Sequence, residues 1–211
     1  MQIFPRTLNL LPLVGALVAA GGGAATVFAF WYWASPKHQQ VGYAPEQPIA
    51  FSHRLHAGEL GIDCRYCHAN VERSAEAMVP STQTCMGCHA VVKADSPLLE
   101  PLRRSWQTGE PVRWVRVHKL TDTVFFDHSA HLAVGIGCES CHGRVDHMEV
   151  VRVVEPIAMQ WCLQCHRDPA PALRPRDAVT RMGYVRTEAD APRIADASRL
   201  QPPQHCSGCH R

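Results

Sequence analysis

The motif Cys-x-x-Cys-His occurs five times in this chain and is its strongest chemical signal. In such a motif both cysteines add to the vinyl groups of a porphyrin, and the adjacent histidine binds the iron from one side. The pattern therefore predicts five covalently bound haem c groups. The attaching residues are Cys64 and Cys67, Cys85 and Cys88, Cys138 and Cys141, Cys162 and Cys165, and Cys206 and Cys209, with proximal ligands His68, His89, His142, His166 and His210.

Zinc ribbons, thioredoxin-like redox pairs and disulfides also use paired cysteines. None of them requires a histidine directly after each pair. With 13 histidines in 211 residues, five successive matches would arise by chance about once in a million. All ten cysteines of the chain fall inside the five motifs, so none is left for another role.

The amino-terminal segment predicts a membrane anchor. No charged residue lies between Arg6 and Lys37, and Leu10–Trp33 is long and apolar enough to span a bilayer. A cleaved signal peptide would have an apolar region of only about 7–15 residues. Arg6 favours a cytoplasmic amino terminus, and Trp31–Trp33 suits the outer interface. We therefore expect a single helix in the bacterial inner membrane, with the haems on the periplasmic side.

An internal repeat organises the rest of the chain. The stretch FSHRLHAGELGIDCRYCH at 51–68 has a second copy, FDHSAHLAVGIGCESCH, at 126–142, and equivalent positions lie 74 to 77 residues apart. This repeat predicts the duplication of a two-haem unit. The expected organisation is an anchor at 1–36, a linker at 37–50, a first dihaem module at 51–92, a connector at 93–125 and a second module with three haems at 126–211.

The predicted fold class is mainly α with much irregular structure. Ser96 as N-cap, Pro97 at the first position and Gly109 past the end predict a helix in the connector. Alternation over 112–120 predicts a short strand. Residues 167–211 are rich in proline, and we expect the fifth haem to hold them against the rest. The net charge of +2, with interspersed signs, predicts no nucleic-acid surface.

Each iron needs a sixth ligand unless its site is kept open for chemistry. His53, His56, His128 and His131 are the first candidates, because both pairs recur at one place in the repeat. Methionine is an alternative that would raise the potential of its iron, although a buried thioether more often fills the core. Other candidates are His118, Met148 and Met159, whereas His38, His147 and His205 have weaker contexts.

The run F-x-H-x-x-H ahead of each first motif resembles the small multihaem cytochromes of the c3/c7 type. In that family the first histidine serves the haem of the motif that follows, and the second serves another haem. The resemblance implies that His53 binds the iron of His68, and His128 the iron of His142.

Four stretches carry a second resemblance: VERSAEAMVPSTQTCMGCH at 71–89, WVRVHKLTDTVFFDHSAH at 114–131, IAMQWCLQCHRDP at 157–169 and CSGCHR at 206–211. On these stretches the chain resembles the membrane-anchored pentahaem cytochrome c subunits of bacterial alternative complex III. This resemblance implies an electron-transfer subunit of a quinol-oxidising respiratory or photosynthetic complex, with its quinol site in partner subunits. Electrons would pass from an iron–sulfur subunit and polytopic quinol-binding membrane subunits toward a periplasmic cytochrome c or oxidase. His118 and Met159 lie inside matching stretches, so the distal ligands of the fourth and fifth haems stay open.

Two other functions compete with this interpretation. The chain could be a self-contained membrane quinol dehydrogenase that feeds a periplasmic reductase, which would need a haem close to the anchor. It could instead be a reductase with an open iron, although such sites often replace the motif histidine by lysine and all five motifs here keep histidine.

Overall fold

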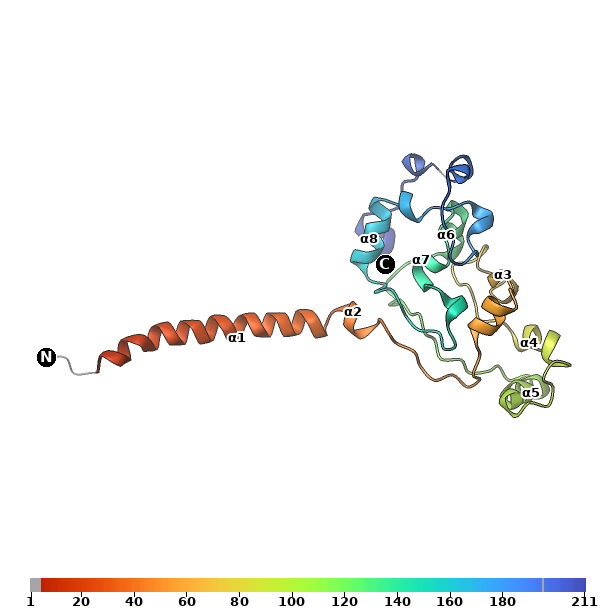
Figure 1. The fold of residues 1–211 in the computed structure, drawn as a ribbon, viewed down its shortest axis with the longest axis horizontal. Coiled ribbons are helices and arrows are strands. Elements are labelled where there is room, and N and C mark those ends of the chain that lie inside the picture. Colours follow the sequence, from red (N-terminus) through yellow and green to blue (C-terminus); the bar gives the residue numbers. More distant parts are fainter. Residues whose placement is uncertain (1–4, 195) are drawn as a thin grey trace.

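The computed structural model describes residues 5–194 and 196–211. A long helix, α1 (Leu11–Trp33), stands away from the rest of the molecule and leads through the short α2 (Pro36–Gln39) into it (Figure 1). Together with the 3₁₀ turn Arg6–Leu10 it forms a 28-residue apolar segment, none of which is buried. Its length and composition are those of a membrane-spanning helix, as the sequence predicts.

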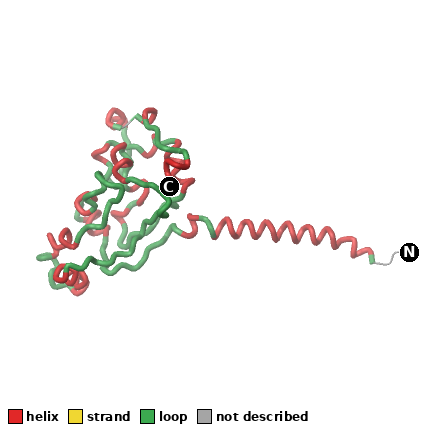
Figure 2. Tube along the Cα trace, turned by 180° about the vertical axis from the view of Figure 1, so that it is seen from behind, coloured by secondary structure: helices red, strands yellow, loops and turns green. Residues whose placement is uncertain are grey.

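Short helices joined by loops make up the remainder, and each Cys-x-x-Cys-His motif includes part of one. No strand occurs in the described ranges, as Figure 2 shows, so the predicted mainly helical and irregular fold is confirmed. The helices are α3 (Cys64–Cys67), α4 (Thr82–His89), α5 (Glu100–Thr108), α6 (His128–Val134), α7 (Glu139–His142), α8 (Met159–Arg167) and α9 (Cys206–Cys209), with a π-helical segment η2 (Arg54–Glu59) and the 3₁₀ segments Pro97–Leu99, Val145–His147, Ala170–Ala172, Arg176–Ala178, Glu188–Arg193 and Ala197–Arg199.

The predicted connector helix is present. Pro97 opens a 3₁₀ turn that passes directly into α5. Gly109 ends the helix in the left-handed conformation, with φ 75°. Proline at a first turn and glycine after the last turn are the local signals that set these two boundaries.

The predicted strand at 112–120 is wrong. This segment lies in extended and bend conformations without a neighbouring strand. Its backbone is held by one side chain instead: Gln47 Nε2 donates to the Val115 carbonyl at 2.8 Å, and Val115 N donates to Gln47 Oε1 at 2.9 Å. Alternating residues do not make a strand where no partner strand supplies the hydrogen-bond ladder.

The buried apolar core is small, and the C-terminal region contributes to it. Val71 of the first module, Leu132 on α6 and Val179 pack together as one cluster. Val179 is only 2% exposed. The proline-rich part of the chain is therefore packed against both copies of the repeat.

The linker after α2 runs along the haem-binding part. Gly42 N donates to the Val153 carbonyl at 2.8 Å, and Val153 N donates to the Tyr43 carbonyl at 3.0 Å. These bonds hold the end of the anchor segment beside the chain that leads into α8. Helices α4 and α5 lie on the side of the molecule farthest from α1 (Figures 1 and 2).

Candidate haem-binding sites

A phenylalanine holds two histidines in the same way in both copies of the repeat. Phe51 meets the His53 ring edge-on at 4.8 Å and stacks on the His56 ring at 4.4 Å. In the second copy Phe126 meets the ring of His128 edge-on at 4.7 Å and stacks on that of His131 at 4.8 Å. The predicted repeat is thus a repeat of side-chain geometry as well as of sequence.

The turn that presents each histidine pair is capped at an equivalent residue. Ser52 Oγ accepts from Leu55 N at 3.1 Å. Asp127 accepts from Ser129 N at 2.8 Å and from Ala130 N at 3.3 Å. Side-chain oxygens at this position satisfy amides of the first turn, which have no partner within the helix.

Three of these four histidines face the histidine of a motif across a gap. We number the motifs 1 to 5 in chain order. The ring centres of His56 and His89 (motif 2) are 6.2 Å apart. Those of His128 and His142 (motif 3) are 6.3 Å apart with planes 8° from parallel, and those of His131 and His166 (motif 4) are 6.1 Å apart.

This spacing is that of two imidazoles on opposite sides of one metal ion. With metal–nitrogen bonds of about 2 Å, the two ring centres lie roughly 6 Å apart. Direct stacking would bring them closer, as in the Phe51–His56 pair at 4.4 Å. The three pairs therefore fit six-coordinate haem irons.

The protonation of the rings fits the same role. Six histidines place Nδ1 within 2.6 to 2.9 Å of a backbone carbonyl oxygen. Because a carbonyl only accepts, Nδ1 carries the proton and Nε2 is left free to bind a metal. The pairs are His56 with Ser52, His68 with Met78, His89 with Val92, His128 with Ala75, His131 with Asp127, and His166 with Pro203.

Burial keeps several of these rings neutral. Burial, and next the neighbouring His118, lowers the pKa of His142 to about 3. Burial, and next His68, lowers the pKa of His53 to about 4. Burial also lowers the pKa of His131. A metal-binding imidazole must be neutral, so these histidines are ready to act as ligands at neutral pH.

None of the ten cysteines, all of which lie in the described part of the chain, is in a disulfide, so each can form a thioether bond. Residues 32–100 match the family described as "Class III cytochrome C family", and residues 124–211 match "Cytochrome c7 and related cytochrome c". The chain is a multihaem c-type cytochrome. The cytochrome is also 35% identical over 131 residues to a protein of Nitratidesulfovibrio vulgaris named "Menaquinone reductase, multiheme cytochrome c subunit". That match covers 58% of this chain and 60% of the relative, less than two thirds of its length.

His118 lies within the same group of rings but in a different relation to them. Its ring centre is 4.4 Å from that of His142 and nearly perpendicular to it, at 82°. This distance is too short for two ligands on opposite sides of one iron. The Nε2 atom of His118 is buried without a hydrogen-bond partner. His118 therefore packs against the His142 ring and keeps a free ligand nitrogen.

The remaining candidate sixth ligands of the cytochrome lie in places less suitable for binding an iron. His147 Nε2 accepts from Arg144 Nη2 at 2.8 Å in a side chain that is 66% exposed. His38 is exposed beside the Tyr32 ring. Met159 is 65% exposed at the start of α8, whereas Met148 is buried and 5% exposed. His205 is the N-cap residue of α9.

The segment 174–180, which we call the C-terminal strap, also shapes the sites, and the sequence did not predict its contacts. The Arg174 guanidinium pairs with Glu139 of α7 at 2.9 Å, and both side chains are largely buried. Its carbonyl approaches Gly135 (φ 95°) so closely that a Cβ there would clash. The sequence predicts only that the fifth haem holds this region. A buried arginine within a proline-rich run gives no periodic signal that could have revealed the contact.

Proposed function

We propose that the cytochrome binds five haem c groups and relays electrons as a subunit of a quinol-oxidising membrane complex. The observation that carries this proposal is the set of facing histidine pairs, with ring centres 6.1 to 6.3 Å apart. Iron held on both sides by histidine has no position for a substrate, so such a site exchanges electrons.

We assign the axial ligand pairs from this geometry. His56 and His89 would bind the iron of motif 2, His128 and His142 that of motif 3, and His131 and His166 that of motif 4. For motif 1 the equivalence of the two copies assigns His53 to the iron of His68. Charge interaction with His68 contributes to the lowered pKa of His53, after burial, which supports their proximity.

The fifth site has one assigned ligand, His210. Its motif is held by backbone bonds, since Phe125 N donates to the Cys209 carbonyl at 2.7 Å and Arg211 N to the Thr123 carbonyl at 3.2 Å. The candidates for the sixth ligand are His118, with its free buried nitrogen, and Met159. Met148 is buried beside η2, where its carbonyl accepts from Arg54 N, and we assign it a packing role.

When bound, each haem accepts and donates one electron at a time. The cysteines would attach the haems. Backbone carbonyl oxygens orient the histidine rings by accepting a hydrogen bond from Nδ1–H. Such a bond fixes the tautomer and raises the basicity of the ligand nitrogen.

The proposed location is the bacterial inner membrane, with α1 as an anchor and the haems on the periplasmic side. The 28-residue apolar segment supports the anchor. The proposed partners are an iron–sulfur subunit, polytopic quinol-binding membrane subunits and a further cytochrome c as acceptor. The related multihaem subunit of a menaquinone reductase supports a quinone-linked membrane complex.

The same relative favours a second candidate function in which electrons flow in the opposite direction. Its name describes a complex that reduces menaquinone. Five histidine-ligated irons would serve either direction, because the direction depends on the potentials of the partners. The two candidates therefore share one electron path and differ in which end is the source.

Purification from native membranes on an N-terminal tag tests the proposal and leaves the terminal fifth motif undisturbed. We expect five haem additions in the intact mass, no carbon monoxide binding to the reduced haems, and co-purification of iron–sulfur and polytopic subunits in fixed ratio. Quinol should then reduce the haems.

Re-oxidation of pre-reduced haems by menaquinone, without reduction by quinol, would favour the second candidate. A chain that purifies alone and still reacts with quinol would instead be a self-contained quinol dehydrogenase.

A further inference from the structure

We infer that the five haem sites lie in the spatial order motif 2, 1, 3, 4, 5, so that electrons enter and leave through motifs 2 and 5. This inference rests on the proposed function, since it requires all five sites to carry haem. The order differs from that of the sequence, in which motif 1 would be the terminal site. Four contacts, each between neighbouring motifs, establish it.

Motifs 2 and 1 are in direct contact. Tyr66 lies inside motif 1, and its hydroxyl oxygen is 3.7 Å from the Cβ position built on Gly87, inside motif 2. The proposed sixth ligand of motif 2, His56, comes from the turn just before motif 1.

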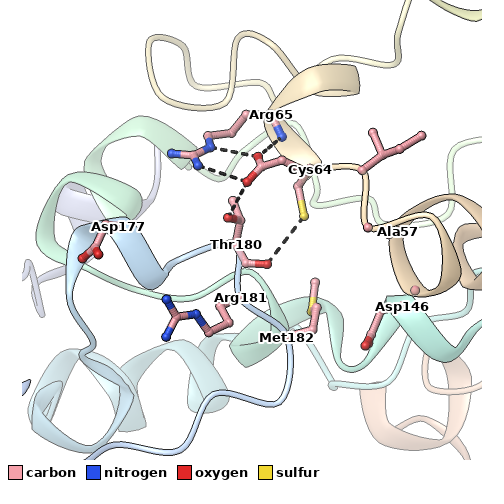
Figure 3. Close-up of a pocket in the computed structure, with 12 residues that line it drawn as sticks. Ala57, Cys64, Arg65, Asp146, Asp177, Thr180, Arg181 and Met182 are labelled. Carbon is pink, nitrogen blue, oxygen red and sulfur yellow. Dashed lines mark hydrogen bonds and ion pairs between the residues drawn. The ribbon is translucent and has the colours of Figure 1, made fainter.

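Motif 1 is joined to motif 3, which lies 74 residues farther along the chain. Two consecutive carbonyls of the C-terminal strap bind them: Val179 O accepts from Cys138 N at 2.9 Å, and Thr180 O lies 4.0 Å from Cys64 Sγ. Figure 3 shows the Thr180 carbonyl directed at the Cys64 thiol beside Arg181 and Met182.

Motifs 3 and 4 share one helix as the source of their proposed sixth ligands. His128 and His131, both on α6, face His142 and His166 respectively. Because these two ligands lie about one turn apart on the same helix, motifs 3 and 4 must be neighbours.

Motif 5 lies against motif 4. The carbonyl of Pro203, three residues before Cys206, accepts from His166 Nδ1 at 2.7 Å. The next residue, Gln204, donates through Nε2 to the His166 carbonyl at 3.2 Å. The ring that serves motif 4 is thus held by the chain that leads into motif 5.

The solvent exposure of the cysteines agrees with this order. Of the ten cysteines, all in the described part of the chain, only Cys88 and Cys206 are exposed. They belong to motifs 2 and 5, the two ends of the row. Motif 2 lies on α4, on the side of the molecule away from α1 (Figure 1), whereas the linker contacts the segment before α8 and motif 4. Motif 2 is therefore the end of the row that lies far from the anchor, and motif 4 lies nearer to it.

Each step along this row moves a single electron, so that one iron is oxidised as its neighbour is reduced and no bond or proton changes. The source and the acceptor at the two ends are one-electron redox proteins of the complex. Since electron transfer slows steeply with distance, a partner exchanges electrons at an exposed end and not through the half-buried middle of the row.

Paired haem deletions distinguish the spatial order from the sequence order. Cys64→Ser with Cys67→Ser removes motif 1, and Cys85→Ser with Cys88→Ser, the matched control, removes motif 2. We expect the loss of motif 1 to leave the haem of motif 2 without a neighbour. The paramagnetic resonance spectrum of the oxidised protein should then show one uncoupled low-spin iron among four. The loss of motif 2 should leave four coupled irons and no isolated one.

The opposite pattern, an isolated iron only after the loss of motif 2, would overturn the inference. Intact mass shows whether each variant carries four haems, and a wild type with fewer than five would contradict the proposed function separately.

If a deletion variant fails to fold, His53→Met and His56→Met keep all haems attached. Each raises the potential of one site, which is then reduced first and becomes diamagnetic. In the partly reduced protein we expect the resonance signal of one uncoupled iron in His53→Met and no such signal in His56→Met. The reverse result would again refute the order.

Discussion

The two copies of the repeat hold their histidines with the same ring geometry but bond them differently. His128 Nδ1 donates to the Ala75 carbonyl at 2.7 Å, whereas the equivalent atom of His53 is buried without a partner. The acceptor belongs to the segment between motifs 1 and 2, which lies outside either repeated stretch. The repeat thus determines where the proposed ligands lie, while a connecting segment supplies the hydrogen bond that would tune one of them.

Removal of a second-position histidine should have the largest effect. His56→Ala should leave the iron of motif 2 without a sixth ligand, and His131→Ala should do the same to motif 4. In each variant we expect about one fifth of the haem to become high-spin and to bind carbon monoxide when reduced. Optical spectra of the oxidised and the carbon monoxide-treated protein measure both changes.

His147→Ala is the matched control, because that imidazole bonds to Arg144 and faces no motif histidine. It should leave all the haem low-spin. An entirely low-spin spectrum in both test variants would refute the ligand assignment for both copies.

Substitution of the first-position histidine by methionine should have the next largest effect. In His53→Met and His128→Met we expect one haem to rise in potential by about 0.1–0.3 V, within the range that axial ligands cover. The rise should be greater for His128→Met, because that change also removes a ring whose Nδ1 bond to Ala75 favours ferric iron. Spectroelectrochemical titration measures both values, and equal shifts would show that the carbonyl bond does not tune the site.

The parts of the molecule that the sequence predicted are those with local signals. The motifs, the histidine pairs, helix α1 and the boundaries of α5 each depend on residue types within a few positions. The facing pairs His56–His89 and His131–His166 join residues 33 and 35 positions apart, and spacing alone left these pairings open.

The carbonyl acceptors could not be predicted at all. The oxygens that bind His128 and His166 come from residues 53 and 37 positions away, and any residue type supplies a carbonyl. The strand predicted at 112–120 failed for a related reason, since the alternation is local but the partner strand it requires is not.

A smaller change in haem potential should follow when the carboxylate charge beside each copy of the repeat is removed. Asp127 bonds to Ser129 and Ala130 and pairs with no lysine or arginine in the described part of the chain. Glu149, beside the first copy, is paired with Arg54. An uncompensated carboxylate favours ferric iron, so Asp127→Asn should raise the potentials of motifs 3 and 4 by roughly tens of millivolts at low salt.

Glu149→Gln should change the potential of motif 2 less, since Arg54 already balances that charge. Hydrogen bonds, chiefly from Ser129, lower the pKa of Asp127, so the carboxylate is charged throughout the neutral range and down to below its ordinary pKa of 3.8. The effect of Asp127→Asn should therefore be constant from pH 8 to about pH 5. An effect that disappeared within that range would assign it to another group.

The smallest effect concerns the caps of the two turns. Ser52→Ala removes the acceptor for Leu55 N and should cost about 1 kcal/mol, which lowers the melting temperature of a chain of this size by roughly 2–4 °C. Asp127→Ala removes acceptors for two backbone amides and the Ser129 hydroxyl, so it should lower that temperature further.

Asn is itself a good cap, and Asp127→Asn should retain most of the stability while it loses the charge. A melting temperature of Asp127→Asn equal to that of Asp127→Ala would mean that the charge, and not the hydrogen bonds, stabilises α6. The second copy would then differ from the first in stability as well as in potential, for the same electrostatic reason.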